Sequence, residues 1–272
     1  MLGLCRFSYP TGGDGFDGVL EDPAANRARL YDPARLSLRF WFFETLCLPT
    51  LRAQTDPDFT VVLLYGEGLP QPWKGRLLAL VADVPQIRPV ALPEGLPHLE
   101  ACGELMRAAR DPEARVVGEF SVDDDDGLAL DFIATARARF EQLRPIWRED
   151  KRAALDFSGG LAVDARGDGL VLSPVQADFW APALVVFCAP RSSRSIQNYN
   201  HKRVWSRVPS LSLPKPVMFL RGAHHANDSR VARRLGASIS RSGPAPEEVL
   251  KDRFGLSAEA LQLRWREFLA TV

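Results

Sequence analysis

The sequence lacks three features that would assign it to a class at once: paired cysteines, a long hydrophobic run and a net charge. Its four cysteines lie far apart and form no Cys-x-x-Cys pair, which argues against a zinc cluster. No apolar run approaches the roughly 18 residues that a membrane span needs, and the N-terminus lacks the basic and apolar regions of a signal peptide. These absences predict a cytoplasmic protein, either free or bound at the periphery of a membrane.

Two kinds of nucleotide or nucleic-acid binding also lack support. Lys and Arg together number 34, as do Asp and Glu, so the chain has no overall basic charge with which to bind a nucleic acid. The glycine-rich residues 10–18 lack the Gly-Lys-Ser/Thr ending of a P-loop. The composition, 46% hydrophobic and 25% charged, is instead that of an ordinary globular protein with a sizeable core.

The first half of the chain alternates expected strands with expected helices. A loop of about two dozen residues is expected before a strongly apolar helix, which Pro49 is expected to divide or kink. Since no hairpin signal interrupts the alternation, the pattern predicts an α/β fold with a mixed, mostly parallel sheet and helices on both faces. The expected strands are 1–9, 59–65, 86–92 and 115–122, and the expected helices are 34–54, 73–81, 98–110 and 128–144.

The second half changes character and contains a predicted β-hairpin. Its two strands flank a turn-rich segment that includes Gly167 and Gly169. Two further short strands precede a tail with two helical segments, the second of which is expected to start at Ser257. The hairpin strands are expected at 152–158 and 169–174, the further strands at 183–188 and 217–220, and the tail at 245–272.

One acidic stretch, residues 118–127, ends the first half. Its four adjacent carboxylates repel one another by about 1 kcal/mol per close pair, so a counter-charge is expected. A hard divalent cation, Mn²⁺ or Mg²⁺, is the simplest one because it takes carboxylate oxygens. In an extended chain, either Asp123 with Asp125 or Asp124 with Asp126 points toward one shared ion. The alternative is a solvated turn in which Asp126 caps the next helix.

A second polar cluster, residues 224–229, follows the short strand at 217–220. Because ligands bind at the carboxyl ends of the strands in α/β sheets, we expect this cluster to meet the acidic stretch there. One of His224 and His225 is then a metal ligand, and an imidazole would favour Mn²⁺ over Mg²⁺. The alternative for residues 227–229 (Asn-Asp-Ser) is a cap for the next helix.

The basic residues of interest are Arg6 and a later run. Arg6 ends the first strand, where a guanidinium is expected to bind a phosphate or diphosphate in a bidentate manner; the alternative is a surface salt bridge. The run from Arg191 to Arg207 is interpreted mainly as a solvated face, with neutralisation of a diphosphate leaving group as the alternative.

The ordered combination of these features resembles the GT-A type of nucleotide-sugar-dependent glycosyltransferase. The strand ending in Asp-x-Asp that marks this type stands here as Val-Asp-Asp-Asp-Asp, residues 122–126. The resemblance covers roughly residues 3–235. More narrowly, four segments are similar to a group of bacterial rhamnosyltransferases: 6–8, 39–54, 59–65 and 224–229.

The resemblance implies a GT-A-like fold with the Asp-x-Asp loop at the strand ends, and a role for each motif residue. Asp123 would lie near the ribose and the metal, Asp125 would bind the metal that bridges the diphosphate, and a C-terminal histidine would complete the metal shell. Four consecutive aspartates leave the register open by one residue. We accordingly assign Arg6, Ser8, Asp123 and Asp124 to the donor, and Asp123, Asp125, Asp126, His224 and His225 to the divalent cation.

The resemblance also implies the activity: transfer of a sugar, with rhamnose as one candidate, from a nucleoside-diphosphate sugar to an acceptor hydroxyl. The acceptor is a glycan, a lipid-linked molecule or a small molecule. Such a transfer with inversion needs a base, for which Asp156, Asp178 and Glu119 are candidates; we assign the role to the first two. Within one continuous domain, the donor-binding half is 1–127, the acceptor-side half is 128–235, and the helical tail is 236–272.

Two other functions are alternatives. Residues 124–127 (Asp-Asp-Asp-Gly) imitate the motif of haloacid-dehalogenase-like phosphohydrolases, but that nucleophile normally follows the first strand, and Leu128 replaces the usual Thr. The second alternative is a non-catalytic nucleotide- or sugar-binding protein with a degenerate acidic site, which would show no turnover of a nucleotide sugar with Mn²⁺.

Overall fold

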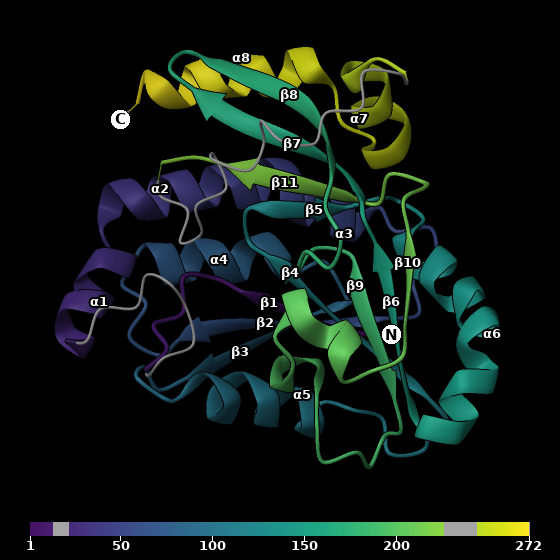
Figure 1. Ribbon diagram of the computed structural model, residues 1–272. Helices are drawn as coiled ribbons and strands as arrows, with labels where there is room; N and C mark the ends of the chain where they lie inside the picture. Colours follow the sequence, from purple (N-terminus) through teal and green to yellow (C-terminus); the bar gives the residue numbers. More distant parts are fainter. Residues whose placement is uncertain (13–21, 226–243, 272) are drawn as a thin grey trace.

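The computed structural model describes residues 1–12, 22–225 and 244–271, and its centre is a seven-stranded sheet (Figure 1). The strands lie in the order β10-β6-β9-β4-β1-β2-β3, and within this sheet β9 runs against the others. The predicted α/β fold with a mostly parallel sheet is therefore confirmed. The strands are β1 (Leu2–Arg6), β2 (Thr60–Gly66), β3 (Ile87–Leu92), β4 (Val117–Asp123), β6 (Arg152–Phe157), β9 (Leu184–Cys188) and β10 (Ser210–Leu213).

A smaller, four-stranded sheet carries the continuation of the acidic stretch. Its order is β5-β11-β7-β8, and β5 pairs antiparallel with β11 so that Asp126 lies opposite Arg221. The chain thus passes from the large sheet to the small one within the acidic stretch itself. The strands are β5 (Asp126–Leu128), β7 (Gly159–Arg166), β8 (Gly169–Gln176) and β11 (Phe219–Ala223).

Helices cover both faces of the large sheet (Figure 1). One face shares a large apolar core with α2, α4, α6, the small sheet and the C-terminal helices, and the other face packs on α5 and the segment that precedes β10. Among the described residues, no helix is both long enough and apolar enough to cross a membrane. The α-helices are α1 (Pro23–Leu30), α2 (Pro33–Phe42), α3 (Leu48–Arg52), α4 (Trp73–Val81), α5 (Glu104–Ala108), α6 (Phe132–Asp150), α7 (Pro246–Phe254) and α8 (Ala258–Leu269). Short π and 3₁₀ turns are η1 (Phe43–Cys47), η2 (Leu99–Gly103), η3 (Ile196–Asn198) and η4 (His201–Ser206).

The apolar helix expected over residues 34–54 is divided, although not at Pro49 itself. It starts with Asp32, whose carboxylate accepts a hydrogen bond from the backbone N–H of Arg35 at 3.0 Å. The π turn η1 widens the helix before α3, and Pro49 then occupies the first turn of α3, where a missing N–H costs little. Fourteen residues of α2, η1 and α3 are buried, as the apolar pattern predicts.

Two expectations for local structure are wrong. The segment up to Pro33 is not wholly loop, because α1 forms there with Asp22 as its N-cap. The helix expected from residue 128 starts instead at Phe132, and Asp126 is a strand residue rather than a helix cap. Pairing of β5 with β11 overrides the local turn signal of Gly127, and this pairing joins residues too far apart in sequence for a local pattern to reveal.

The predicted hairpin exists with a shifted first strand. Its strands are β7 and β8, whereas β6, expected to be the first hairpin strand, belongs to the large sheet. Ser158 separates β6 from β7, so one continuous apolar segment supplies a strand to each sheet. An apolar pattern does not distinguish one long strand from two short ones that part at a bend.

The two C-terminal helices cover the small sheet, and α8 contacts α2. Ser257 caps α8, as predicted, by accepting a hydrogen bond from the N–H of Ala260 at 3.2 Å. The rings of Trp265 and Trp41 lie 5.0 Å apart, and the indole N–H of Trp41 donates to the carbonyl of Arg264 at 3.1 Å. The tail therefore supports α2, the helix that carries Arg39.

Candidate active site

The four aspartates form the junction between the two sheets. Asp123 ends β4 beside Arg6, its register partner at the end of β1, and Asp126 begins β5. The Asp123 side chain is 31% exposed, whereas the other three carboxylates are at most 2% exposed. Asp123 is thus the member of the acidic stretch that faces solvent.

Arg39 supplies the counter-charge for the two middle aspartates. It comes from α2, and its side chain is 8% exposed. Its Nη1 lies 2.5 Å from Oδ2 of Asp125, and its Nη2 contacts Asp124. The planar guanidinium fork allows one arginine to bridge two carboxylates in this way.

Arg221 supplies the counter-charge for the outer two aspartates. Its Nη1 lies 2.6 Å from Oδ2 of Asp126 and 3.3 Å from Oδ2 of Asp123. The N–H of Gly222 donates to Oδ1 of Asp126 at 3.2 Å, and a Cβ at this glycine would meet the carbonyl oxygen of Asp125 at 2.2 Å. Only glycine lets β11 approach the acidic stretch this closely.

His224 reaches the same cluster from the end of β11. Its Nε2 lies 3.1 Å from Oδ2 of Asp125, and its ring packs on Phe42 at 4.6 Å between centroids. Burial lowers the pKa of His224 by more than Asp125 raises it, so the imidazole is neutral at pH 7. His225 is exposed, and the suggested cap at residues 227–229 lies outside the described residues.

The neighbouring carboxyl groups of Asp125 and Asp126 have opposite pKa shifts. Burial raises the pKa of Asp125, but Arg39, the hydrogen bond from His224 and Arg221 outweigh it and hold that pKa well below its usual value. Burial and the charges of Asp125 and Asp123 raise the pKa of Asp126, although Arg221 opposes them. The pKa values of two neighbouring carboxyl groups move apart in this way when both groups cannot ionise freely.

The cluster has the oxygen donors that a divalent cation needs. One carboxylate oxygen each from Asp123, Asp125 and Asp126 lie within 4.8 Å of one another, which fits ligand distances of roughly 2.0–2.6 Å to one shared ion. However, Arg6, Arg39 and Arg221 already offset much of the negative charge. Repulsion among the aspartates therefore does not by itself require an ion, because the arginines already provide the counter-charge that was expected from the sequence.

Two residues assigned to the donor are enclosed by protein. Ser8 is buried, and its hydroxyl accepts a hydrogen bond from Nη1 of Arg35 at 3.0 Å. Asp124 is fully buried against Arg39. Both side chains contact arginines of α2, and their roles toward the donor stay predictions.

Asp156 and Asp178, the two assigned catalytic residues, lie together through Ser212. The hydroxyl of Ser212 donates to Oδ2 of Asp156 at 2.6 Å and to Oδ1 of Asp178 at 3.4 Å. Burial, together with the charge of Asp178, raises the pKa of Asp156 to about 6. A carboxylate with such a pKa is ionised at pH 7 yet basic enough to accept a proton.

The sheet register places Asp156 at the same edge as Asp123. Asp156 lies opposite Leu184 on β9, and Phe120 of β4 lies opposite the next residue, Val185. Asp156 is therefore two strands away from β4, roughly 10 Å across the sheet at the usual strand spacing. Asp156 and Asp123 therefore lie near the same edge of the large sheet, at the carboxyl ends of β6 and β4.

The third candidate base is engaged elsewhere. Glu119 is fully buried, and its carboxylate accepts hydrogen bonds from Nε of Arg110 at 2.8 Å and from the N–H of Ile196 at 2.7 Å. This pairing joins β4 to the segment that follows α5 and to η3, and gives Glu119 a structural role.

Arg39 and Arg221 are site residues that sequence reasoning missed. Arg39 had a signal, because a charged residue in a helix that is apolar nearly all round must find a buried partner. Arg221 directly follows the apolar residues of a strand that was expected to end beside the acidic stretch. Neither signal names the partner, since both pairings join residues far apart in sequence.

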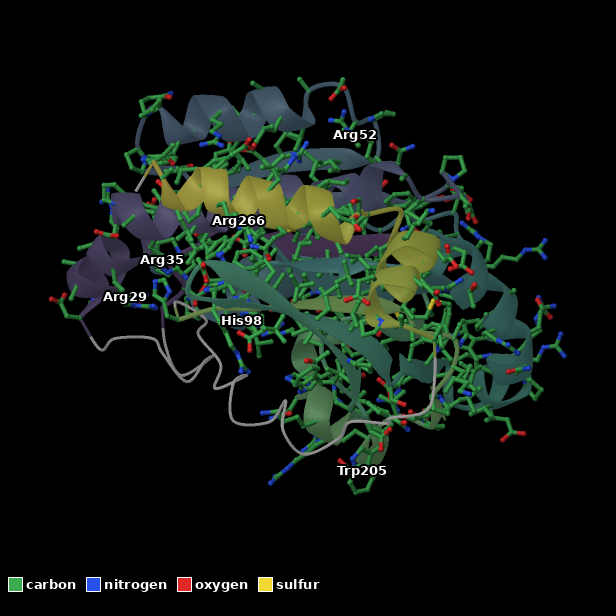
Figure 2. The ribbon with its side chains drawn as sticks, turned by 90° about the horizontal axis from the view of Figure 1, so that it is seen from above. Arg29, Arg35, Arg52, His98, Trp205 and Arg266 are labelled. Carbon is green, nitrogen blue, oxygen red and sulfur yellow. The ribbon has the colours of Figure 1, made fainter. Side chains whose placement is uncertain are left out.

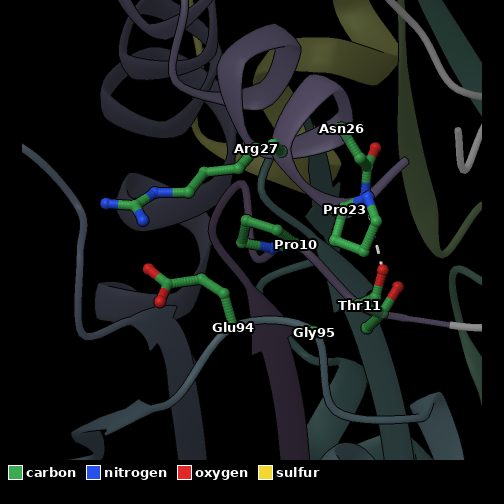
Figure 3. Close-up of a pocket in the computed structure, with 8 residues that line it drawn as sticks. Pro10, Thr11, Pro23, Asn26, Arg27, Glu94 and Gly95 are labelled. Atoms are coloured by element: carbon green, nitrogen blue, oxygen red, sulfur yellow. Dashed lines mark hydrogen bonds between the residues drawn. The ribbon is translucent and has the colours of Figure 1, made fainter.

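A cavity of about 250 Å³ lies beyond the carboxyl end of β1. Figure 3 shows Arg27 of α1 and Glu94 extending along one side of it, with Pro10 between them. Asn26 donates to the carbonyl of Thr11 at 3.3 Å on the other side. This volume is smaller than the roughly 300–1,000 Å³ of pockets for whole ligands, so the cavity suits a part of a larger molecule.

The two histidines are expected to respond differently to substitution. His224→Ala removes an imidazole beside Asp125 and is expected to weaken Mn²⁺ binding by about 10–100-fold, the usual cost of losing a partner of a metal ligand. His225→Ala changes an exposed side chain and should leave the affinity unchanged. Calorimetric titration of both variants with Mn²⁺ measures the difference, and equal affinities would remove His224 from the site.

Comparison with known proteins gives a family for the chain. A family model described as "Putative rhamnosyl transferase" matches residues 1–235. No curated protein matches the sequence. Among solved structures, S. aureus TarS 1-349 is similar at 11% identity with a TM-score of 0.47, over 81% of this chain and 60% of that one. The same fragment in complex with UDP-GlcNAc is similar at 10% identity with a TM-score of 0.47, over 98% of this chain and 71% of that one.

Proposed function

The chain belongs to the rhamnosyl transferase family that its residues 1–235 match, and on this basis we propose that it transfers a sugar from a nucleoside-diphosphate donor to an acceptor hydroxyl. The protein is a glycosyltransferase by this membership, and the family description makes rhamnose the first sugar to test. Membership of this family argues against the two alternative functions, a phosphohydrolase and a non-catalytic binding protein.

One observation carries the proposal for the donor site. At the carboxyl ends of β1 and β4, the partly exposed Asp123 lies between Arg6 at 3.5 Å and Arg221 at 3.3 Å. Two guanidiniums at a strand-end edge are suited to a diphosphate, because they match its oxygens in pairs. We assign the diphosphate to this place and the nucleoside to the cavity beside Pro10 and Thr11.

Asp123 and Asp125, with Asp126, are the residues that would hold a divalent cation, with His224 beside them. Such an ion, when bound, offsets the charge of the leaving diphosphate. The need for it arises from the diphosphate: Arg6 and Arg221 are already paired with aspartates, so they need the cation beside them to hold a further anion. The arginines position these carboxylates and limit their repulsion.

Asp156 is proposed as the base. Its carboxylate accepts the proton of the acceptor hydroxyl while the acceptor oxygen forms a bond to the sugar's anomeric carbon. The bond from that carbon to the diphosphate oxygen breaks, and the diphosphate leaves toward Arg6 and Arg221. A single displacement of this kind inverts the anomeric configuration. Asp178 assists by keeping the pKa of Asp156 raised.

A nucleoside diphosphate is expected to stabilise the protein only together with Mn²⁺ or Mg²⁺. At about a hundredfold over its dissociation constant, the ligand should add roughly 2.7 kcal/mol to the free energy of unfolding. Thermal-shift measurements with a panel of nucleoside diphosphates, with the cation or with EDTA, test this without any turnover. Equal stabilisation in EDTA would mean that the arginines alone bind the diphosphate.

The transfer itself is tested with nucleotide sugars, including a rhamnose donor, and acceptors of the three classes. Release of nucleoside diphosphate coupled to a glycosylated product supports the proposal. Release without product for every acceptor would reduce the proposed activity to hydrolysis of the donor.

A further inference from the structure

A basic surface with an exposed tryptophan lies on the segment that precedes β10. Trp205 of η4 is 60% exposed, more than any other large hydrophobic side chain in the described part of the chain. Figure 2 shows Trp205 at the outer margin of the molecule. We call this region the Trp205 surface; it consists of Trp205 and the exposed residues Arg191, Arg194, Lys202, Arg203 and Arg207.

The positive charge of the Trp205 surface is not balanced locally. Residues 179–225 contain no Asp or Glu at all. Within the described ranges, none of the five cations forms an ion pair. Some exposed arginines elsewhere are paired, for example Arg52 with Asp83 and Arg76 with Glu44. The segment therefore carries an excess of positive charge, which attracts an anionic partner.

The segment beneath this surface is firmly held. Arg110 donates to the carbonyls of Pro190, Ser192 and Arg194 at 3.2, 2.6 and 2.6 Å. Val204, next to the tryptophan, is buried in the core of this face. Because the segment is fixed, the exposure of the indole is a property of the fold, and little ordering is needed on binding.

The indole itself presents an apolar surface to the outside. Its N–H is already bonded within the turn, donating to the carbonyl of Lys202 at 3.2 Å. Trp beside Lys and Arg is the side-chain combination of membrane–water interfaces. Proteins that bind single-stranded nucleic acid instead stack successive bases on several aromatic rings, and no other aromatic side chain of the described residues is among the exposed large hydrophobics.

We propose that the Trp205 surface docks the protein on an anionic lipid bilayer. The basic residues bind the headgroup layer, and the indole enters the interface. The surface lies near the candidate active site, since Gln197, between Arg194 and Lys202, donates a hydrogen bond at 2.7 Å to the hydroxyl of Ser121, two residues before Asp123 on β4. Docking would therefore bring the strand-end edge close to the membrane, where a lipid-linked acceptor would be found.

Vesicle flotation without any nucleotide tests the docking separately from the transfer. The wild type is expected to float with phosphatidylcholine vesicles that contain about 30 mol% phosphatidylglycerol and not with pure phosphatidylcholine vesicles. Arg203→Gln/Arg207→Gln should lower the partition coefficient about 30-fold, since each basic residue near an anionic surface contributes about 1 kcal/mol. The matched control Arg88→Gln/Arg148→Gln removes the same charge from exposed positions on β3 and α6 and should change it less than about twofold.

Trp205→Ala tests the apolar part of the surface. It should weaken binding to the anionic vesicles further, and brominated lipid should quench the fluorescence of the wild type more than that of Trp205→Phe. Unchanged unfolding temperatures show that the variants fold. No flotation with anionic vesicles, equal losses in the control pair, or an unaffected Trp205→Ala variant would overturn the proposal. It would also be overturned by binding of single-stranded RNA that Arg203→Gln/Arg207→Gln abolishes while vesicles do not bind.

Discussion

Asp156→Asn is expected to lower kcat by about 10²–10⁴-fold, the usual contribution of a general base, while making the protein more stable. The folded protein raises the pKa of Asp156 from its ordinary value of 3.8 to about 6, chiefly by burial. Ionisation of the buried carboxyl therefore opposes folding above pH 6, and asparagine has no such charge. The variant should gain nothing below about pH 4 and up to about 3 kcal/mol above pH 6. Urea unfolding at pH 4 and pH 8 measures both values.

The pH dependence of the wild type gives a second readout. Because the base must be ionised, kcat/KM should rise with pH through about 6. The hydrogen bond from Ser212 lowers the pKa of Asp156, so Ser212→Ala should move that rise to higher pH without abolishing activity. If Asp156→Asn kept full activity, or if it lost stability at pH 8, Asp156 would not be the base in this buried and ionised form.

Arg39→Met is expected to destabilise the protein by about 3–5 kcal/mol, the cost of removing one partner from a buried ion pair. Arg39 contacts both Asp124 and Asp125, which are at most 2% exposed and would lose their common counter-charge. Urea unfolding at pH 7 measures the loss. Arg52→Met is a matched control: Arg52 also pairs with a carboxylate, but it is 47% exposed, so the same change should cost about 1 kcal/mol or less.

A second substitution distinguishes lost charge balance from lost packing. Asp124→Asn in the Arg39→Met background removes one of the two uncompensated charges and should recover part of the stability, with a coupling of about 0.5–3 kcal/mol. No recovery would show that the alkyl chain of Arg39, rather than its charge, stabilises this part of α2.

The regular part of the fold could be predicted from local patterns. The strand expected at 59–65, the edge strand at 86–92 and the helix at 73–81 lie within one residue of β2, β3 and α4. Each is a short apolar or amphipathic segment bounded by Gly or Pro, so local sequence suffices. The three-residue strand β5 could not be predicted, because only the non-local pairing with β11 makes it a strand.

The candidate site was predicted in its parts but not in its electrostatics. That one of His224 and His225 would meet the acidic stretch was predicted, because both segments follow short apolar strands, and the structure places Nε2 of His224 3.1 Å from Asp125. The two strands nevertheless belong to different sheets, β4 to the large one and β11 to the small one. That Arg39 and Arg221 would balance the aspartates did not follow, since a sequence pattern shows which residues carry charge but not which pairs are buried together. The closeness of Asp156 to Asp178 likewise depends on Ser212, on a strand more than thirty residues farther along the chain.

The pairing of β5 with β11 can form only after β11 has been synthesised. Asp126 leaves the ribosome 95 residues before Arg221 does, a delay of roughly 5–20 s at ordinary elongation rates. During that interval Arg6 and Arg39 are already available, whereas β5 has no partner strand and Asp126 has no arginine. The large sheet can start to form, but a chain arrested at this stage would present an unpaired strand edge. The proposed donor site is thus completed late, when residues 219–224 close the junction between the two sheets.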